Sequence, residues 1–544
     1  MSAASTWRSL LPSRQDYRHL RQSWRADLVA GLTVGIVALP LALAFGVSSG
    51  VGAEAGLVTA IVAGLVAAVF GGSNVQVSGP TGAMVVILLP IVAQHGAAAV
   101  AVVSILAGAM IVAAGLLRWG RIVGYLPWPV IEGFTVGIGV IIFLQQVPSA
   151  LGVDGSGHAT NALIAAGEAV AAADLTAAVP SLVAVLVVAA VMVVLPRVST
   201  RVPASFVAIL LVTVLAAALR LPLDTIGALP STLPAPALPA VSSLAVIDLL
   251  APAFAVAALA AIESLLSARV AATMSDTGGL HADRELVGQG LASVASGLFG
   301  GMPATGAIAR TVVNVRAGAR SRLSAIVHAL SLLAVVYVAG SAVAVIPLAA
   351  LSGVLMVTAA RMVSLRAVRR VVGSTRSDAV VFGITAVITV SFDLVVAVAI
   401  GIAAAAFFAL QALSRASGVH REELAGAPHP GDERIALFRI DGSLFFGAAQ
   451  RVLDRLTAHE GTEVVVLRLS QLHLVDSTGA RTLAELVAAL EQRGMTVLIK
   501  GIRPEHVRLL GKAGAIGSLR HPNHLFTDLD AAIAHARSHV ARAA

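Results

Sequence analysis

Two charged side chains stand inside otherwise apolar stretches of the sequence. Glu263 lies in the run AAIESLLS (260–267), and Arg310 ends the run TGAIAR (305–310). A carboxylate taken out of water must be paired, bind a cation or hold a proton, and an arginine in an apolar segment is costly and usually functional. Ser267, one helical turn after Glu263, could be a second ligand for a cation. The two charges therefore predict a site for a coupling ion and an anion or, alternatively, a structural ion pair between Glu263 and Arg310.

The composition places most of the chain in a membrane. Of its 544 residues, 58% are hydrophobic and 12% are charged, whereas about 25% of the residues of soluble globular proteins are charged. Between Leu28 and Leu117 the only formally charged residue is Glu54. Cysteine is absent, which excludes disulfides, thiolate metal sites and cysteine catalysis. The net charge of +8 is spread over short loops, so nucleic acid is not an expected partner.

Gly and Pro divide the apolar region into about 14 segments. A helix that crosses a membrane needs about 20 residues, so some of these segments are too short to span as full helices. The expected segments are 28–48, 55–70, 80–94, 98–117, 128–145, 176–196, 204–219, 249–268, 287–299, 305–315, 323–341, 344–360, 378–392 and 395–412.

The arginines indicate how these segments are oriented. If the N-terminus is cytoplasmic, every second connection should be basic. The connections after segments four, six, ten, twelve and fourteen carry arginine, whereas the connection 146–175 has none. We therefore expect a multi-pass protein of a bacterial inner membrane with both its N-terminus and its C-terminal domain in the cytoplasm. The arginines of these basic connections are Arg118, Arg121, Arg197, Arg201, Arg316, Arg320, Arg322, Arg361, Arg366, Arg369, Arg370, Arg376 and Arg415.

The two halves of the apolar region repeat each other. The order FGG then PTGAM (70–84) recurs as FGG then ATGAI (299–308), and Asp27-Leu28 recurs as Asp248-Leu249. The matched segments are the first and eighth and the third and tenth. Because the offset of seven is odd, the halves have opposite orientations in the membrane. Inverted repeats with short, Gly- and Pro-interrupted segments at matching places indicate a substrate site near the midplane.

The character of the sequence changes after Arg415. We expect a cytoplasmic N-terminal segment over 1–25, a membrane domain over 26–415, a linker over 416–433 and a small α/β domain over 434–544. The last domain is expected to have strands over 435–440, 464–469 and 496–499 and helices over 447–458, 478–493, 504–513 and 529–541.

Several motifs, in order along almost the whole chain, resemble the SulP anion-transporter family, also called solute carrier family 26. The resemblance implies an all-α membrane domain with a seven-plus-seven inverted repeat, divided into a core and a gate domain, in a homodimer. It also implies that a STAS domain, with the α/β fold expected above, follows the membrane domain. The motifs are ADLVAGLTVGIVALPLALAFG (26–46), SGPTGAM (78–84), LPWPVIEGFTVGIG (126–139), RELVGQGLASVASG (284–297), FGGMPATGAIARTVVNVRAGARS (299–321), FDLVVAVAIGI (392–402), RIDGSLFFGAAQRVLDRL (439–456) and LVDSTGARTL (474–483).

The resemblance further implies an anion site where the third and tenth segments meet N-terminus to N-terminus. Free backbone amides and helix dipoles at two converging N-termini attract an anion in low dielectric. Thr81 and Thr305 could donate hydroxyl groups to it; alternatively, each caps its own helix. The other residues expected at the site are Phe45, Gly79, Gly82, Gly306, Ala307 and Arg310.

Two further roles come from the same resemblance. An acidic residue at the position of Glu263 is implicated in binding the coupling ion. Some relatives that transport bicarbonate have Asp there and use sodium, whereas the Glu of this chain leaves a proton possible. In the STAS-like domain, Ser477 matches a position that is phosphorylated in soluble relatives; alternatively, Ser477 or Asp476 only caps the following helix.

We therefore expect secondary active transport of a small anion by alternating access, with sulfate, bicarbonate and C4-dicarboxylates as candidates and sodium or a proton as the coupling ion. An anion exchanger, a channel-like conductor or a membrane motor of the same fold is the alternative. An enzyme is not expected, because no Ser/His/Asp set, metal cluster or phosphate loop is recognisable, and no GxxxxGK[ST] motif suggests an ATP-driven pump. No cofactor other than the coupling ion is expected.

Overall fold

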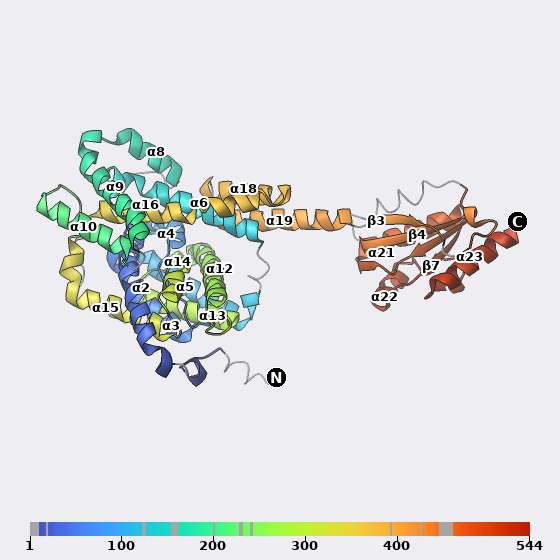
Figure 1. Cartoon of the computed structure of the whole chain (residues 1–544), viewed down its shortest axis with the longest axis horizontal. Helices are drawn as coiled ribbons and strands as arrows, with labels where there is room; N and C mark the ends of the chain where they lie inside the picture. The colour runs from blue at the N-terminus through green and yellow to red at the C-terminus, as the bar shows by residue number, and fades with distance from the viewer. Residues whose placement is uncertain are drawn as a thin grey trace. The chain divides into compact units, whose positions relative to one another are not determined.

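The chain folds as two units, Met1–Ile402 and Ala403–Ala544, each of which is described by itself (Figure 1). In this computed structural model the first unit is helical and the second is built around a sheet. The structure describes residues 10–17, 20–121, 127–153, 161–199, 202–227, 232–239, 243–391, 394–416, 418–424, 427–444 and 461–543.

Every expected apolar segment has a helix in its place, because in a bilayer a helix satisfies its backbone polar groups within itself. Among the described residues, 8 helices are long and apolar enough to cross a membrane. The helices are α2 (Leu20–Ser48), α3 (Ala53–Phe70), α4 (Gly82–His95), α5 (Ala98–Leu116), α6 (Trp128–Gln145), α9 (Leu175–Val198), α10 (Ala204–Ala218), α12 (Leu250–Met274), α13 (Ala282–Leu298), α14 (Ile308–Arg316), α15 (Leu323–Ala344), α16 (Leu348–Met362), α18 (Arg376–Ser391) and α19 (Leu394–Ala416).

Further short helices lie before α2 and in the connections between the expected segments. They are η1 (Arg14–Tyr17), α7 (Val147–Ala150), α8 (Ala162–Ala172), α11 (Ser243–Asp248) and α17 (Leu365–Val372).

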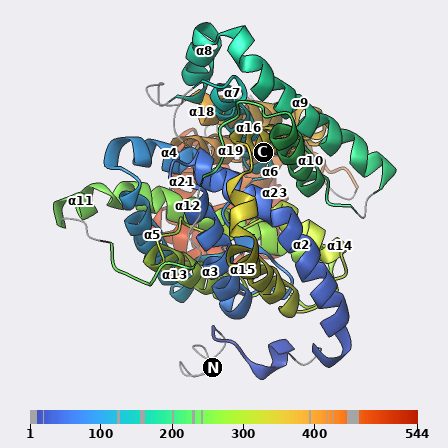
Figure 2. The same ribbon diagram turned by 90° about the vertical axis from the view of Figure 1, so that its left-hand side faces the viewer.

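The helices of the first unit pack as two groups. The first helix group consists of α2–α5 and α12–α15, and the second helix group consists of α6–α10 and α16–α18. Figure 2 shows the second group above the first, with α2 running beside α15. The groups meet where α2 packs on α10 and α16 and where α4 packs on α6. Each half of the repeat supplies helices to both groups, which agrees with the core and gate arrangement expected from the resemblance.

Two short strands stand immediately before the half-length helices α4 and α14. β1 (Ser78–Gly79) pairs antiparallel with β2 (Thr305–Gly306), with Ser78 opposite Gly306 and Gly79 opposite Thr305. Pro80 keeps the residue before it out of helical geometry, and Gly79 has a φ of 153° that favours glycine. The repeated sequence motif therefore folds as a strand followed by a helix start in both halves.

The turn that leads into β1 is held by a buried carboxylate on α13. Glu285 Oε2 accepts hydrogen bonds from the amides of Gly72 and Ser73 at 2.7 and 3.2 Å. Gln289, one turn further along α13, donates to Glu285 at 2.9 Å and to the hydroxyl of Ser78 in β1. The motif RELVGQG thus positions the first strand of the pair.

The second unit has a mainly parallel sheet in the order β3-β4-β5-β7-β8, with β6 paired to β4. Apolar residues alternate along β4, so that Phe438 packs with α21 on one face and Leu437 packs with α23 on the other. The elements are β3 (Gly418–Glu422), β4 (Ile435–Leu444), β5 (Val464–Arg468), β6 (Leu472–Val475), α21 (Ser477–Gln492), β7 (Thr496–Lys500), α22 (Pro504–Lys512), η4 (Pro522–His524), β8 (Leu525–Phe526) and α23 (Leu529–Ala543).

The expected strands and three of the four expected helices of this unit are present as β4, β5, β7, α21, α22 and α23. The helix expected over 447–458 lies outside the described residues. The segment expected as a linker, 416–433, contains β3, which pairs antiparallel with β4. A short strand at the edge of a sheet is difficult to recognise from sequence, because it is stabilised mainly by its pairing with the neighbouring strand.

Candidate functional site

The starts of α4 and α14 meet across the strand pair, and neither helix has a side-chain cap. The first amides of a helix have no partner within it. Among the described residues, no group accepts from the amides of Gly82 and Ala83 in α4 or from that of Ile308 in α14. Two helix N-termini with free amides therefore face one region, which is a favourable place for an anion.

Two threonine hydroxyls converge on one carboxylate between these helix starts. Thr81 Oγ1 and Thr305 Oγ1 each donate to Glu263 Oε2 at 2.9 Å, and the two hydroxyl oxygens lie 3.3 Å apart. Both threonines are buried, whereas Glu263 on α12 is partly exposed. The alternative that the threonines cap their own helices is not observed, because Thr81 makes no cap hydrogen bond and Thr305 lies in β2.

Arg310 lies behind this cluster in the first turns of α14. Its side chain is only 2% exposed, and its Nη2 donates to the carbonyl oxygen of Pro80. Its Nη1 has no hydrogen-bond partner among the described residues. Arg310 and Glu263 are close enough to interact electrostatically, but no ion pair joins them in the described part of the chain. The structural ion pair considered as an alternative is therefore not formed.

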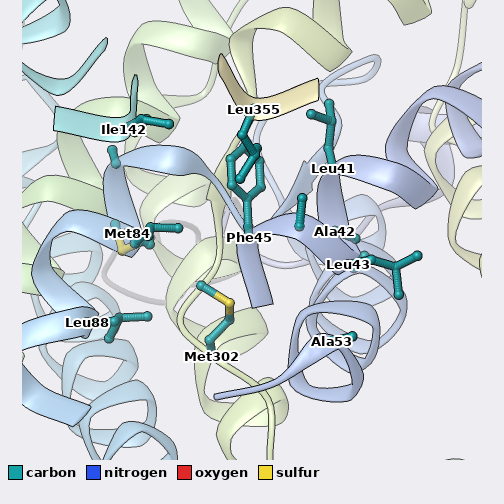
Figure 3. Packing of buried hydrophobic residues seen from close by; sticks show 14 of the residues in the cluster. Leu41, Ala42, Leu43, Phe45, Ala53, Met84, Leu88, Ile142, Met302 and Leu355 are labelled. Atoms are coloured by element: carbon teal, nitrogen blue, oxygen red, sulfur yellow. The ribbon is translucent and has the colours of Figure 1, made fainter. Parts of the chain in front are cut away.

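The predicted glycines bring backbone close to these side chains. A Cβ at Gly79 would lie 2.8 Å from Arg310 Nη1, and one at Gly82 would lie 2.3 Å from Ile142 Cδ1 and 3.2 Å from Phe45 Cε1. Figure 3 shows Phe45 among Met84, Leu355 and other apolar side chains. Phe45 therefore packs beside the start of α4, and its part in binding a substrate stays a prediction.

The backbone amides of two predicted site residues, Gly306 and Ala307, donate hydrogen bonds within the protein. The amide of Gly306 donates to Ser264 Oγ at 3.0 Å, and the amide of Ala307 donates to the carbonyl oxygen of Val77 at 2.8 Å. In this state neither amide is free for a ligand. Both residues nevertheless shape the second helix start.

No hydrogen bond joins Ser267 to Glu263 in the described part of the chain. The Ser267 hydroxyl lies 3.1 Å from Thr311 Oγ1, which in turn accepts from the amide of Val77. Ser267 therefore supports α14 and the strand pair from α12, and its use as a second cation ligand would require a rearrangement.

Two buried polar residues around the site, Gln76 and His328, were not among the predicted site residues. Gln76 donates to the carbonyl oxygen of Ser264, and a Cβ at Gly306 would collide with its amide group. His328 on α15 is fully buried near Arg310, and neither ring nitrogen has a partner among the described residues. The sequence could have indicated His328 only through its position as a histidine inside the apolar run 323–341.

In the second unit, Asp476 caps α21 by accepting from the amide of Gly479 at 2.7 Å. Ser477 is the first residue of the helix and is exposed. Asp476, and not Ser477, is therefore the residue that caps the helix. Phosphorylation of Ser477 stays a prediction.

A multi-span helical bundle with two unwound segments facing each other, followed by a small α/β domain, defines a class of membrane transporters. The family model described as "Sulfate permease family" matches residues 24–385, and the STAS domain model matches residues 428–532. The chain belongs to the sulfate permease (SulP) family, with a C-terminal STAS domain. It is therefore a multi-pass anion transporter and not an enzyme.

Relatives with known names cover nearly the whole chain. The protein named "Putative sulfate transporter YvdB" of Bacillus subtilis (strain 168) is 34% identical over 91% of this chain and 94% of its own length. The bicarbonate transporter BicA of Synechocystis is 31% identical over 90% of each chain.

Solved structures confirm the fold. The overall structure of SLC26A9 covers 96% of this chain and 91% of its own, with a TM-score of 0.81 and 16% sequence identity. The transmembrane domain of a cyanobacterial BicA covers 69% of this chain and 97% of its own, with a TM-score of 0.61 and 32% identity.

Proposed function

We propose that the protein is a secondary active transporter that moves a small anion across a bacterial inner membrane by alternating access. The anion binds between Thr81 and Thr305 at the N-termini of α4 and α14, and transport is coupled to a proton or a sodium ion at Glu263. The observation that carries the proposal is the convergence of both threonine hydroxyls on Glu263. The names of the relatives favour sulfate or bicarbonate as the anion, and a C4-dicarboxylate is the third candidate.

An anion between the starts of α4 and α14 would lie beside hydrogen-bond donors and in a positive electrostatic potential, without direct contact with a formal positive charge. The hydroxyls of Thr81 and Thr305 converge between the starts of α4 and α14, where the amides of Gly82 and Ile308 have no acceptor among the described residues, and Arg310 supplies a charge behind them. Such preorganised donors act strongly because the surrounding dielectric is low.

Glu263 provides the coupling because its carboxylate and the anion need the same two hydroxyl groups. A charged Glu263 holds both hydroxyls and repels an anion. A proton or sodium ion on Glu263 removes the repulsion and releases the hydroxyl groups. The anion and the cation therefore strengthen each other's binding by the same factor.

The location of the site also suits alternating access. Gly82 at the start of α4 in the first helix group lies against Ile142 of α6 in the second. Phe45 of the first group packs in the same cluster as Leu355 of α16 in the second. A movement of one group against the other would therefore expose the site alternately to the two sides of the membrane.

The proposal is tested by uptake into proteoliposomes that contain the purified full chain. Labelled sulfate, bicarbonate and a C4-dicarboxylate are supplied with a pH gradient, a sodium gradient, both or neither. We expect concentrative uptake of at least one anion with one of the gradients and without ATP. No uptake of any of the three under any condition would contradict the proposal.

Replacing either threonine should weaken the anion site. We expect Thr81→Ala and Thr305→Ala each to raise the KM by about 10- to 100-fold, because a hydrogen bond to a charged group contributes roughly 1.5–3 kcal/mol. Serine at either position should retain most of the affinity. Thr358→Ala is the matched control, because among the described residues the Thr358 hydroxyl bonds only to the carbonyl oxygen of Val354 in its own helix. A KM unchanged in both alanine variants would remove the threonines from the site.

The arginines in every second connection predict the orientation of the protein in the membrane. We propose that both termini are cytoplasmic and that the protein is a homodimer, as the family resemblance implies. A reporter fused after Ala544 should be active only if it is a cytoplasmic reporter, whereas a periplasmic reporter at the same position should be silent. The opposite pattern would reverse the proposed orientation.

A further inference from the structure

Three histidines of the second unit come together from two elements. His535 and His539 lie one turn apart on α23, and His524 ends the short helix η4. One ring nitrogen of each lies within 4.8 Å of those of the other two, and the Nε2 atoms of His535 and His539 are 3.2 Å apart. These three residues are called the histidine cluster below.

The cluster contains a polar atom that the protein leaves unsatisfied. His524 is only 3% exposed, and its Nδ1 has no hydrogen-bond partner among the described residues. A buried ring nitrogen without a partner is unfavourable, and a native structure rarely leaves one without a purpose. A ligand that accepts a nitrogen lone pair would remove this cost.

The spacing of the cluster fits a tetrahedral metal ion. With zinc–nitrogen bonds of about 2.0–2.1 Å, two imidazole ligands of a tetrahedral ion have nitrogens about 3.3 Å apart. The pair on α23 already has this separation, and the third nitrogen needs only a small side-chain movement. Histidines at positions i and i+4 of one helix can point to the same ion. The three ligands that the cluster offers are imidazole nitrogens, which suit zinc, copper and nickel.

We propose that the histidine cluster binds a divalent transition-metal ion, Zn²⁺ in the first instance, with three imidazole ligands and a fourth position open to water. The ion would join η4 to α23, whose apolar face covers β4, β5 and β7. It would therefore fasten the last helix to the sheet. The proposal concerns the STAS domain alone and does not depend on the identity of the transported anion.

The test uses the full chain in detergent, purified with a tag that contains no histidine and stripped of metal with a chelator. Zn²⁺ is titrated by calorimetry, and Co²⁺ is added as a spectroscopic probe. We expect one Zn²⁺ per chain and the visible absorption of tetrahedral Co²⁺. We also expect Zn²⁺ to raise the melting temperature of the second unit.

Three variants make the result specific. His535→Gln and His539→Gln should each weaken Zn²⁺ binding by about 100-fold or more, since even the loss of an outer-shell partner of a ligand costs 10- to 100-fold. Both should also lose the stabilisation by Zn²⁺. His473→Gln, an exposed histidine of the same unit, should bind as the unchanged chain does. Absence of Zn²⁺ binding, or equal binding by all three variants, would overturn the proposal and leave a packed group of imidazoles. Because melting without metal is measured for every variant, a folding defect is recognised separately.

Discussion

Glu263→Gln should abolish anion accumulation driven by a pH or sodium gradient while leaving anion exchange between the two sides of the membrane. Glutamine has nearly the shape of a protonated glutamate, so it should, like the protonated form, leave the hydroxyl groups of Thr81 and Thr305 available to the anion. It has no charge to gain or lose, and hence no reason to carry a proton or sodium ion through the cycle. The measurement compares accumulation under an imposed gradient with counterflow of labelled anion in the same proteoliposomes.

The control for this prediction is Glu132→Gln, which removes a partly exposed carboxylate from α6. It should leave accumulation intact. Because no ion pair joins Glu263 to Arg310, Glu263→Gln should not lower the thermal stability. A double variant that also lacks Arg310 should therefore be no more stable than Glu263→Gln. Accumulation that survives in Glu263→Gln would show that this residue is not the coupling site. A loss of stability that the double variant restores would establish the structural role instead.

Arg310→Gln should have the second largest effect, a rise in the KM for the anion of about 100-fold or more. The charge of Arg310 lies in low dielectric behind the proposed anion position, where electrostatic attraction is strong, and its loss also leaves the carbonyl oxygen of Pro80 without its donor. Arg310→Lys should retain part of the affinity because the charge remains. Since the effect is electrostatic, uptake of a divalent anion should suffer more than uptake of a monovalent one.

Arg361→Gln is the matched control for Arg310→Gln. Arg361 on α16 also donates to a backbone carbonyl, that of Met192, but it is exposed and lies outside the proposed site. Its replacement should leave the KM unchanged. If Arg310→Gln only lowers the amount of folded protein, with normal KM in what remains, Arg310 is structural.

The membrane fold follows closely from the sequence because apolar length and arginine placement are strong signals. Each expected segment is a helix, and the FGG and TGA motifs mark the two places where the chain is unwound between α3 and α4 and between α13 and α14. Helix ends were less predictable. α2 begins at Leu20, before the expected residue 28, because the polar residues of its first turns are compatible with a helix but carry no apolar pattern.

The residues of the candidate site were also recognisable, but their contacts were not. The sequence shows that Glu263, Thr81 and Thr305 lie on three elements, yet only the pairing of β1 with β2 brings them together. The contact of Ser267 with Thr311 depends on how α12 faces α14, which the spacing of Ser267 from Glu263 does not reveal.

The histidine cluster illustrates the same limit in the second unit. The spacing of His535 and His539 is visible on an expected helix, but a pair alone does not indicate a metal site. The third member, His524, reaches them only because β8 joins the sheet beside β7 and returns the chain to α23.

The central claim is that transport through the site at Glu263 is coupled to a cation. It is tested most directly by measuring the anion gradient that remains when net uptake has stopped. Proteoliposomes with the full chain are given a series of pH or sodium gradients, and the ratio of internal to external anion is measured once uptake has stopped. The ratio should rise steadily with the size of one of these gradients and fall to one when an ionophore removes it. A ratio that stays at one for every gradient, although labelled anion crosses the membrane rapidly, would contradict coupling and identify an exchanger or a channel-like conductor.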